Sequence, residues 1–161
     1  DTLSLCICNG CQLMVELDLV YPEHGEKVKM LHNASHKFES AFLSVDVVES
    51  NSVLLKSLAG SRLGIWVAHG EGRFQLPYGQ EEYNIPLRYS HDTYPANPNG
   101  SSFATAAICS KDGRHLAMMP HLERSLHPWN WGYYAEDRNG DEVSPWIEAF
   151  VNARLWIEEH K

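Results

Sequence analysis

The feature that most constrains the fold of this chain is the stretch from residue 4 to residue 14, where an apolar, strand-like run ends in a cysteine and a helical pattern begins. A strand that turns directly into a helix holds the residue at the turn exposed above the sheet, and the backbone N–H groups that follow point at whatever bonds to it. A helix N-terminus also lowers the pKa of a cysteine thiol, and its amides can hold a developing oxyanion. The pattern therefore predicts a nucleophile elbow with Cys8 as the candidate nucleophile.

The spacing C-x-C-x-x-C of Cys6, Cys8 and Cys11 admits two further interpretations. The three thiols could bind zinc or an iron–sulfur cluster, but such a site usually needs a fourth ligand, and Cys109 stands alone among apolar residues. The three could instead be buried and pack as small hydrophobic side chains. The spacing by itself leaves the catalytic, the buried and the metal-binding interpretations open.

Length and composition bound the class of the protein. A chain of 161 residues with 43% apolar residues is long enough for one domain with a hydrophobic core. The formal net charge of -8 argues against nucleic acid as a partner, because binding the phosphate backbone needs clustered Lys and Arg. No apolar run reaches the roughly 18 residues of a membrane span, so no membrane partner is expected. Four cysteines without a leader sequence before Asp1 indicate a cytoplasmic protein and a piece of a longer chain.

The hydrophobic periodicity predicts an α/β fold with a mixed sheet. Strands are expected over residues 2–7, 28–32, 38–48, 63–68, 85–89, 103–109 and 115–119. A short helix is expected over residues 12–19, with Leu13, Met14 and Leu17 on its apolar face. A last helix is expected from Pro145 to about residue 159. Its apolar face is expected to consist of Trp146, Phe150, Ala153 and Ile157.

Two loops follow or join these elements. Residues 69–73, with the sequence His-Gly-Glu-Gly-Arg, come directly after an apolar strand, which is where α/β folds place ligand contacts. Glycine equally permits a plain turn with a solvated Glu–Arg pair. Residues 94–100 are typical of a rigid connector, since proline and Asn-Gly favour turns by backbone preference.

His121 and Glu123 follow a hairpin whose two strands are joined by an Asp112-Gly113 turn signal. In an extended segment residues two apart face the same side, so the imidazole and the carboxylate could point together as a base and the group that orients it. A solvated His and Glu at a strand exit is the alternative.

Four segments, in this order, resemble a known family: residues 8–12, 69–73, 94–100 and 118–124. They are similar to the glutaminase domains of the formylglycinamide ribonucleotide amidotransferases of purine synthesis, which are class I, or triad-type, glutamine amidotransferases. The resemblance covers essentially the whole chain. It implies a flavodoxin-like α/β fold in which residues 1–161 are a partial domain that starts at the elbow, with the N-terminal portion of the domain missing.

The same match implies the roles of individual residues. Cys8 is the nucleophile, His121 the general base and acid, and Glu123 the residue that orients the imidazole. The substrate-binding residues that the match implies are Asn9, Gly10, Gln12, His69 and Gly70. No metal site is implied in this chain.

Two positions depart from the family pattern. Cys6 replaces the first glycine of G-x-C-x-G-x-Q and adds a side chain where strand and helix pack closely. Leu122 stands where a proline is common between His and Glu. Neither change removes a catalytic atom. Cys6 is expected to affect the geometry of the elbow, and Leu122 the rigidity of the His–Glu segment.

The resemblance implies a ligase with a glutaminase half-reaction. Glutamine is hydrolysed here, and the ammonia passes to a synthetase domain that uses ATP and magnesium, while this part of the enzyme needs no cofactor. The family places an oxyanion loop and further strands before the elbow, so the chain alone is expected to be weak or inactive and to self-associate. The alternatives are another triad-type glutamine amidotransferase and a non-enzymatic, cysteine-rich metal-binding module.

Overall fold

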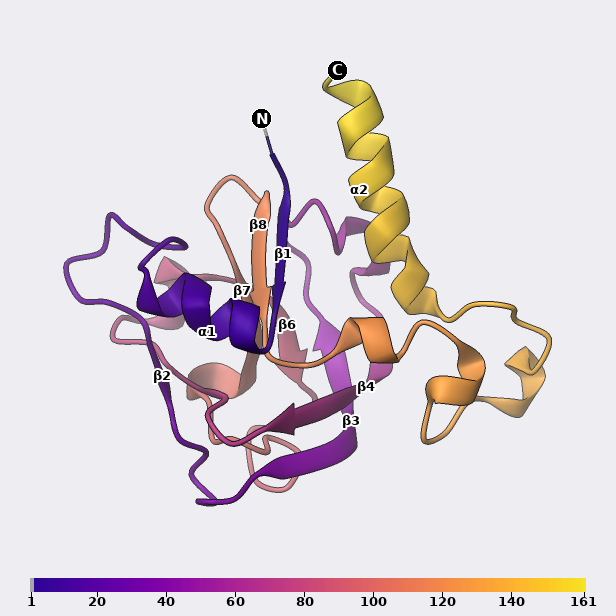
Figure 1. Ribbon diagram of the computed structural model, residues 1–161, viewed down its shortest axis with the longest axis horizontal. Helices are drawn as coiled ribbons and strands as arrows, with labels where there is room; N and C mark the ends of the chain where they lie inside the picture. The colour runs from indigo at the N-terminus through magenta and orange to yellow at the C-terminus, as the bar shows by residue number, and fades with distance from the viewer. Residues whose placement is uncertain (1) are drawn as a thin grey trace.

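The computed structural model describes residues 2–161; Asp1, the first residue of the expected domain, lies outside them. Its strands are β1 (Ser4–Ile7), β2 (Lys29–Leu31), β3 (Glu39–Val47), β4 (Arg62–His69), β5 (Arg73–Gln75), β6 (Asn84–Tyr89), β7 (Thr105–Cys109) and β8 (His115–Met118). Six of them form one sheet in the order β1-β8-β7-β6-β3-β4, and β2 pairs with β5 in a small second sheet (Figure 1). Within the large sheet β1 is parallel to β8 and the other neighbours are antiparallel. The expected α/β fold with a mixed sheet is confirmed.

The two α-helices are α1 (Asn9–Glu16) and α2 (Glu148–Glu159). Short 3₁₀ turns occur at Lys56–Leu58, Gln80–Glu82, Ser102–Ala104, Leu122–Arg124, Pro128–Asn130, Glu136–Arg138 and Pro145–Ile147. Neither α-helix is long and apolar enough to cross a membrane, and the same holds for every other helical segment in residues 2–161.

The apolar face expected for the first helix is confirmed for Met14, which packs against the core, and wrong for Leu13 and Leu17. The helix begins directly after Cys8 and buries Cys11 and Val15, while Leu13 and Leu17 are 59% and 56% exposed. The early start shifts the buried stripe, because the side chains that face the sheet are set by where the helix leaves β1 rather than by the most apolar set. The last helix shows the same effect: Trp146, Ala149 and Asn152 are buried, while Phe150 and Ile157 are partly exposed.

Two groups of buried side chains cover the two faces of the sheet, since neighbouring residues in a strand point to opposite faces. Ala107, Cys109, Leu116 and Met118 belong to the group that includes Trp146 and Ala149 of the C-terminal segment. Ile108, Ala117 and Met119 belong to the group that includes Cys11 and Val15 of α1. The sheet therefore lies between α1 on one face and the Pro145–Glu159 segment on the other.

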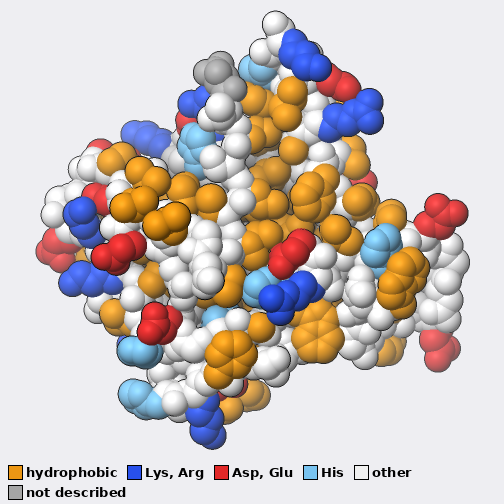
Figure 2. Space-filling view, in the orientation of Figure 1, with side chains coloured by type: hydrophobic (Ala, Val, Ile, Leu, Met, Phe, Trp, Pro, Cys, Tyr) orange, Lys and Arg blue, Asp and Glu red, His pale blue; other side chains and the backbone are white. Residues whose placement is uncertain are grey.

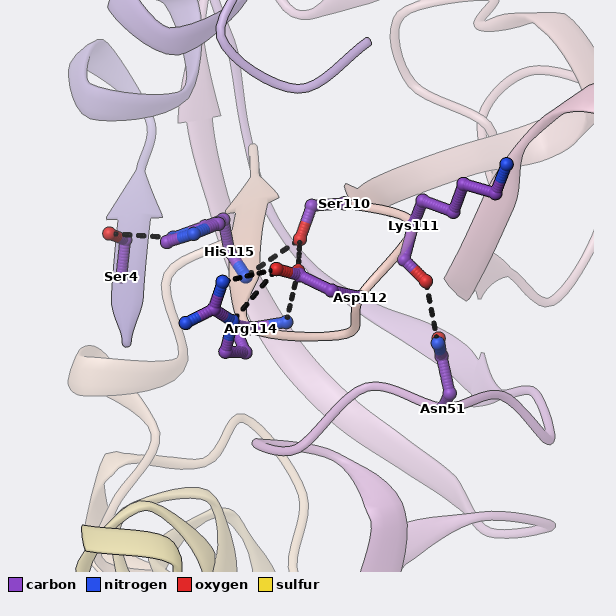
Figure 3. A network of polar contacts seen from close by, with 7 residues as sticks. All are labelled: Ser4, Asn51, Ser110, Lys111, Asp112, Arg114 and His115. Atoms are coloured by element: carbon purple, nitrogen blue, oxygen red, sulfur yellow. Dashed lines mark hydrogen bonds and ion pairs between the residues drawn. The ribbon is translucent and has the colours of Figure 1, made fainter. Parts of the chain in front are cut away.

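The β7–β8 hairpin is confirmed, and its turn is held by polar contacts (Figure 3). The Asp112 carboxylate accepts hydrogen bonds from Ser110 Oγ at 2.6 Å and from Arg114 Nε at 2.7 Å. The hydrogen bond from Ser110 lowers the pKa of Asp112 by more than burial raises it. With the further lowering by Arg114, the pKa falls to about 2. His115 Nδ1 lies 3.1 Å from Ser4 Oγ, which ties the start of β8 to β1. This hairpin leads directly to His121.

The turn itself requires glycine at position 113. Gly113 has φ 79, and a Cβ there would meet the backbone oxygen of Asn51. Gly60 has φ 81 with no atom within 4 Å of the Cβ position, and Gly140 has neither constraint.

We expect Gly113→Ala to lower the free energy of unfolding by more than about 2 kcal/mol, since it combines left-handed strain with a backbone clash. Gly60→Ala, which carries strain alone, should cost about 1 kcal/mol, and Gly140→Ala should change stability by less than about 0.5 kcal/mol. Urea denaturation of the three variants gives the ranking. Equal losses at positions 113 and 60 would contradict the clash.

Candidate active site

The predicted strand-to-helix turn is present, and Cys8 stands at its apex. Cys8 has φ 51 and ψ -105 between the last residue of β1 and the first residue of α1. Its N–H donates to the Met118 carbonyl at 2.9 Å, and its own carbonyl accepts from Gln12 N at 3.0 Å. A positive φ costs free energy in a residue with a Cβ and persists only where the surrounding structure imposes it. Here the β1–β8 pairing on one side and the first helical hydrogen bond on the other impose it.

The Cys8 thiol is half-buried, and its S–H donates to the Ala68 carbonyl at 3.9 Å. Burial raises the pKa of Cys8, against a lowering by the Asn9 backbone N–H and the charge of Arg124, while Glu123 raises it further. The resting thiol is therefore protonated at neutral pH. It needs a neighbouring base to become a nucleophile.

His121 and Glu123 are brought together as expected. The carboxylate can only accept, so His121 Nδ1–H donates to Glu123 Oε1, at 2.6 Å. Burial raises the pKa of Glu123, but the hydrogen bonds from His121 and from the Glu123 backbone N–H together lower it by more. The net pKa is therefore below the ordinary value. This leaves His121 Nε2 as the ring atom that can accept a proton. Nε2 is buried and has no hydrogen-bond partner among the described residues.

The backbone that pairs these residues differs from the expectation. His121 precedes a 3₁₀ turn, Leu122–Arg124, so the segment is not extended. The tight turn, rather than strand alternation, brings the carboxylate back to the imidazole. Leu122, the departure from the family pattern, is fully buried in the core. Its side chain fixes the turn by packing, so rigidity does not depend on proline at this position.

Cys8 and His121 lie at the same edge of the sheet. β1 and β8 are parallel neighbours paired from Ser4↔His115 to Ile7↔Met118, so their carboxyl ends coincide. Cys8 follows the first strand by one residue, and His121 follows the second by three. In the described structure the thiol donates to Ala68, and the imidazole Nε2 is free. Cys8 Sγ and His121 Nε2 therefore make no hydrogen bond with each other in the described structure.

The loop 69–73 follows β4 and lies beside the elbow, since Cys8 bonds to Ala68 and Gln12 bonds to Glu71. His69 is 2% exposed and both of its ring nitrogens lack hydrogen-bond partners. Burial lowers the pKa of His69 to about 4, the neighbouring His121 lowers it too, and Glu39 partly opposes this. His69 is therefore neutral at pH 7. Unpartnered buried nitrogens are rare in folded proteins and typically mark a site where water or a ligand binds.

Buried amides clamp the backbone of residues 69–73, while the Glu71 side chain remains exposed and lies 3.3 Å from His32 Nδ1 rather than pairing with Arg73. Asn33 Nδ2 donates to the carbonyl of His69 at 2.7 Å, and Asn33 Oδ1 accepts from Gly72 N at 3.1 Å. Asn99 Nδ2 donates to the Gly72 carbonyl at 2.6 Å. Both asparagines are completely buried. The connector 94–100 thus supports the loop as well as joining two strands.

Sequence reasoning missed Asn33 as a residue that shapes the site. It lies in the connection between β2 and β3, which has no periodicity, and its role depends on the loop after β4, which is far away in the sequence. For Asn99 a signal existed, because it belongs to one of the four segments that carry the family resemblance.

Gln12, Asn9 and Gly10 all lie in α1 beside the thiol. Gln12 Nε2 donates to the Glu71 carbonyl at 2.8 Å. This bond ties α1 directly to residues 69–73, which we call the glycine loop. Asn9 and Gly10 are the first two residues of the helix, whose N–H groups have no partner within the helix. A Cβ at Gly10 would lie 3.5 Å from Cys6 Cβ, an ordinary contact. The Cys6 side chain therefore fits beside the helix without displacing it.

Asn9, Gly10 and Gln12 follow Cys8 in α1, and Cys8 and Gln12 contact Ala68 and Glu71, which flank the other two expected substrate-binding residues, His69 and Gly70. Among residues 2–161 no group of three or more His, Cys, Asp or Glu is placed to hold a metal ion. All four cysteines are free thiols, and Cys11 and Cys109 are buried.

Residues 1–157 match the family of CobB/CobQ-like glutamine amidotransferase domains. The chain is 45% identical to "Probable phosphoribosylformylglycinamidine synthase, chloroplastic/mitochondrial" of Arabidopsis thaliana, over 98% of this chain and 13% of that protein. It is 38% identical to human phosphoribosylformylglycinamidine synthase, over 99% of this chain and 14% of that protein. The chain thus spans a small part of the length of the relatives it matches.

Two solved structures are similar to the fold. PurLQS from Thermotoga maritima has a TM-score of 0.70 and 26% identity, covering 94% of this chain and 60% of that chain. A putative subunit of GMP synthase from Thermoplasma acidophilum has a TM-score of 0.50 and 13% identity, covering 96% of this chain and 58% of that chain. The second likeness concerns the fold alone.

The lowered pKa of His69 predicts a pH-dependent stability. Because the folded pKa, about 4, lies below the ordinary 6.5, the neutral His69 contributes fully above pH 6.5 and this contribution is lost as the pH falls toward 4. His69→Gln has no such titration. The stability advantage of the native chain over the variant should shrink by about 2 to 3 kcal/mol between pH 7.5 and 4.5.

Urea denaturation at the two pH values measures this difference. His91→Gln gives the baseline for replacing an exposed histidine. A His69→Gln difference that does not change with pH would contradict the burial of a neutral imidazole.

Proposed function

Because this chain belongs to the family of CobB/CobQ-like glutamine amidotransferase domains, we propose that it is the glutaminase part of a phosphoribosylformylglycinamidine synthase. In this proposal it hydrolyses glutamine and supplies ammonia for de novo purine biosynthesis. The observation that supports the chemistry most is the elbow, where Cys8 at φ 51 stands beside the hydrogen-bonded pair of His121 and Glu123. The proposal treats residues 1–161 as part of a class I glutamine amidotransferase domain.

In the proposed first step, Cys8 Sγ turns from Ala68 to His121 and gives its proton to Nε2. The thiolate then attacks the side-chain amide carbon of glutamine, and a tetrahedral intermediate forms. The amide nitrogen cannot leave as NH₂⁻, so His121 returns the proton to it and ammonia departs. A γ-glutamyl thioester on Cys8 remains.

In the second step His121 Nε2 removes a proton from water, which attacks the thioester and releases glutamate. Glu123 keeps the proton of the imidazole on Nδ1 and stabilises the positive charge that appears twice in the cycle. The net pKa of Glu123 lies below its ordinary value, which keeps the carboxylate ionised for this role at neutral pH.

The substrate is proposed to lie between α1 and the glycine loop. The N–H groups of Asn9 and Gly10 would face the developing oxyanion, and Gln12, His69 and Gly70 would border the glutamine. The neutral His69 suits a pocket for an uncharged amide, since a buried cation there would attract the wrong end of the substrate.

The partner in the parent enzyme is proposed to be a synthetase domain that uses ATP and magnesium, with no cofactor at the site described here. Neither nucleic acid nor a membrane is a proposed partner. A cytoplasmic location is part of the proposal, although the Arabidopsis relative is named as chloroplastic/mitochondrial.

The chain on its own is proposed to be a weak or inactive glutaminase that self-associates. β1 is an edge strand of the sheet formed by the described residues. Figure 2 shows hydrophobic side chains gathered beside this strand and over α2. The exposed hydrophobic side chains of α2 are Phe150, Val151, Leu155 and Ile157, each 39% to 46% exposed. An unpaired edge next to an apolar surface favours association.

Two alternatives are less well supported. Another triad-type glutamine amidotransferase would need the same triad, but the curated relatives named above favour the purine enzyme. A cysteine-rich metal-binding module would need a ligand group, and residues 2–161 present none.

The proposal is tested by Cys8→Ala in the enzyme that carries this chain. Glutamine-dependent product formation should fall to background, while ammonia-dependent formation should stay near the normal rate, because only the source of ammonia is lost. Cys6→Ala is the matched control, since Cys6 lies two residues away and has no proposed chemistry. Normal glutamine use by Cys8→Ala would require another nucleophile.

Glu123→Gln should be milder than Cys8→Ala. The amide cannot stabilise the imidazolium, so the glutaminase kcat should fall by up to about 10⁴-fold and still exceed that of Cys8→Ala. Steady-state glutaminase assays compare the variants, with Glu159→Gln on the exposed end of α2 as control. A Glu123→Gln enzyme with the normal kcat would remove this residue from the triad.

A further inference from the structure

Cys11 is a buried thiol for which the proposed glutaminase chemistry has no use. It lies three residues after Cys8, in the sequence Cys-Asn-Gly-Cys, with Cys8 as the N-cap of α1 and Cys11 as its third residue. A C-x-x-C pair at a helix N-terminus after a strand is the arrangement in which cysteines exchange between dithiol and disulfide.

The helix fixes the separation of the two residues. Gln12 N donates to the Cys8 carbonyl, so the helical hydrogen-bond pattern already includes Cys8. Residues three apart in an α-helix have Cα atoms about 5 Å apart. Disulfides need roughly 4.4 to 6.8 Å. The side chain at the third helical position also leans back toward the N-cap, as the capping box illustrates.

The surroundings of the two thiols place them in one environment. Cys8 packs against the buried group to which Cys11 belongs. Burial raises the pKa of the Cys11 thiol well above its ordinary value, and the neighbouring Cys6 and Cys8 raise it further, so Cys11 interacts with both of the other thiols of the elbow.

Cys6 is the competing partner for Cys8. Residues two apart along a strand have Cα atoms about 6.6 Å apart, at the upper limit for a disulfide. Cys6 Cβ also faces the Cβ position of Gly10, at 3.5 Å, on the helix. The geometry therefore favours Cys11.

We propose that oxidation of Cys8 by a peroxide is followed by formation of a reversible Cys8–Cys11 disulfide. The bond itself depends only on the positions of the two cysteines. Its consequence for activity, reversible inactivation of the nucleophile, rests on the proposed glutaminase function.

The chemistry proceeds in two balanced steps. Cys8 Sγ attacks one oxygen of hydrogen peroxide, the O–O bond breaks, and Cys8 sulfenic acid and water form. Cys11 Sγ then attacks the Cys8 sulfur, the S–OH bond breaks, and the Cys11 proton leaves with the hydroxide as a second water. The two thiols lose two electrons together and the peroxide gains them. Cys8 is the sulfur that reacts first, because it is partly exposed while Cys11 is fully buried.

The disulfide would protect the enzyme from irreversible loss. A sulfenic acid without a neighbouring thiol continues to sulfinic acid, which ordinary dithiols do not reduce. A disulfide with Cys11 stops that progress, and a dithiol such as dithiothreitol restores both thiols. Cys11 is thus a resolving cysteine for the nucleophile.

The experiment treats the enzyme that carries this chain with hydrogen peroxide, alkylates the remaining thiols and maps the peptide that contains residues 6–11. The native protein should show Cys8 and Cys11 unalkylated with the loss of two hydrogens, and dithiothreitol should reverse this. Cys6→Ser is the matched control and should give the same bond. Cys11→Ser should instead accumulate Cys8 sulfinic acid and fail to recover.

Cys11→Ala repeats the measurement in case serine at this buried position unfolds the domain, and circular dichroism checks the fold of each variant. A bridge that persists without Cys11, or Cys8 overoxidation in the native protein with Cys11 still alkylated, would overturn the proposal. Because peptide mapping does not depend on activity, a Cys8–Cys11 bond without glutaminase activity would count against the proposed function alone. Activity without the bond would count against this inference alone.

Discussion

The parallel pairing of β1 with β8 is the constraint on which the candidate site depends. It continues past the strand, since Cys8 N–H donates to the Met118 carbonyl, and this bond holds the elbow in its strained conformation. It also makes the two strands end together, so that the segments after them, with Cys8 and His121, start from neighbouring points. The β7–β8 turn matters to the candidate site for the same reason: a shift of β8 by one residue would move the imidazole away and turn its neighbours to the other face.

The glycine loop obeys a second constraint, the satisfaction of buried backbone groups. Its carbonyl and N–H groups are paired by Asn33 and Asn99, whereas the imidazole nitrogens of His69 and Nε2 of His121 are left without partners among residues 2–161. In the described part of the chain, buried side-chain atoms of His24, Ser35, Glu39, Ser52 and Arg88 are also without partners, so the contrast at this loop is consistent with the proposed glutamine pocket but does not single it out.

The cysteines of the elbow illustrate how one spacing can hold different roles. Cys8 is the half-buried nucleophile of the proposal, Cys11 is buried within the core, and Cys6 fits beside the helix, since even a Cβ at position 10 would make only an ordinary contact with it. Burial raises the pKa of Cys6, Cys8 and Cys11 alike, so local position rather than intrinsic acidity separates them. In the proposed function, Cys8 is the thiol at the elbow that would attack the substrate. The neighbour one helical turn away is suited to protect it.

The sequence by itself determined seven of the eight strands, all but β5, together with the elbow and the β7–β8 hairpin, because these depend on local periodicity, turn chemistry and motifs a few residues long. It failed for the buried faces of the helices: Leu13 and Leu17 are apolar but exposed, since the direction in which α1 leaves β1 decides which side meets the sheet. It also failed for Asn33, whose partners lie 36 to 39 residues away and become neighbours only when β4 is placed. The pairing of His121 with Glu123 was predicted from strand alternation and occurs through a 3₁₀ turn instead. Tertiary structure decided these points because helix orientation and long-range hydrogen bonds are set by contacts between segments, and a single segment of sequence carries no information about the surface it will meet.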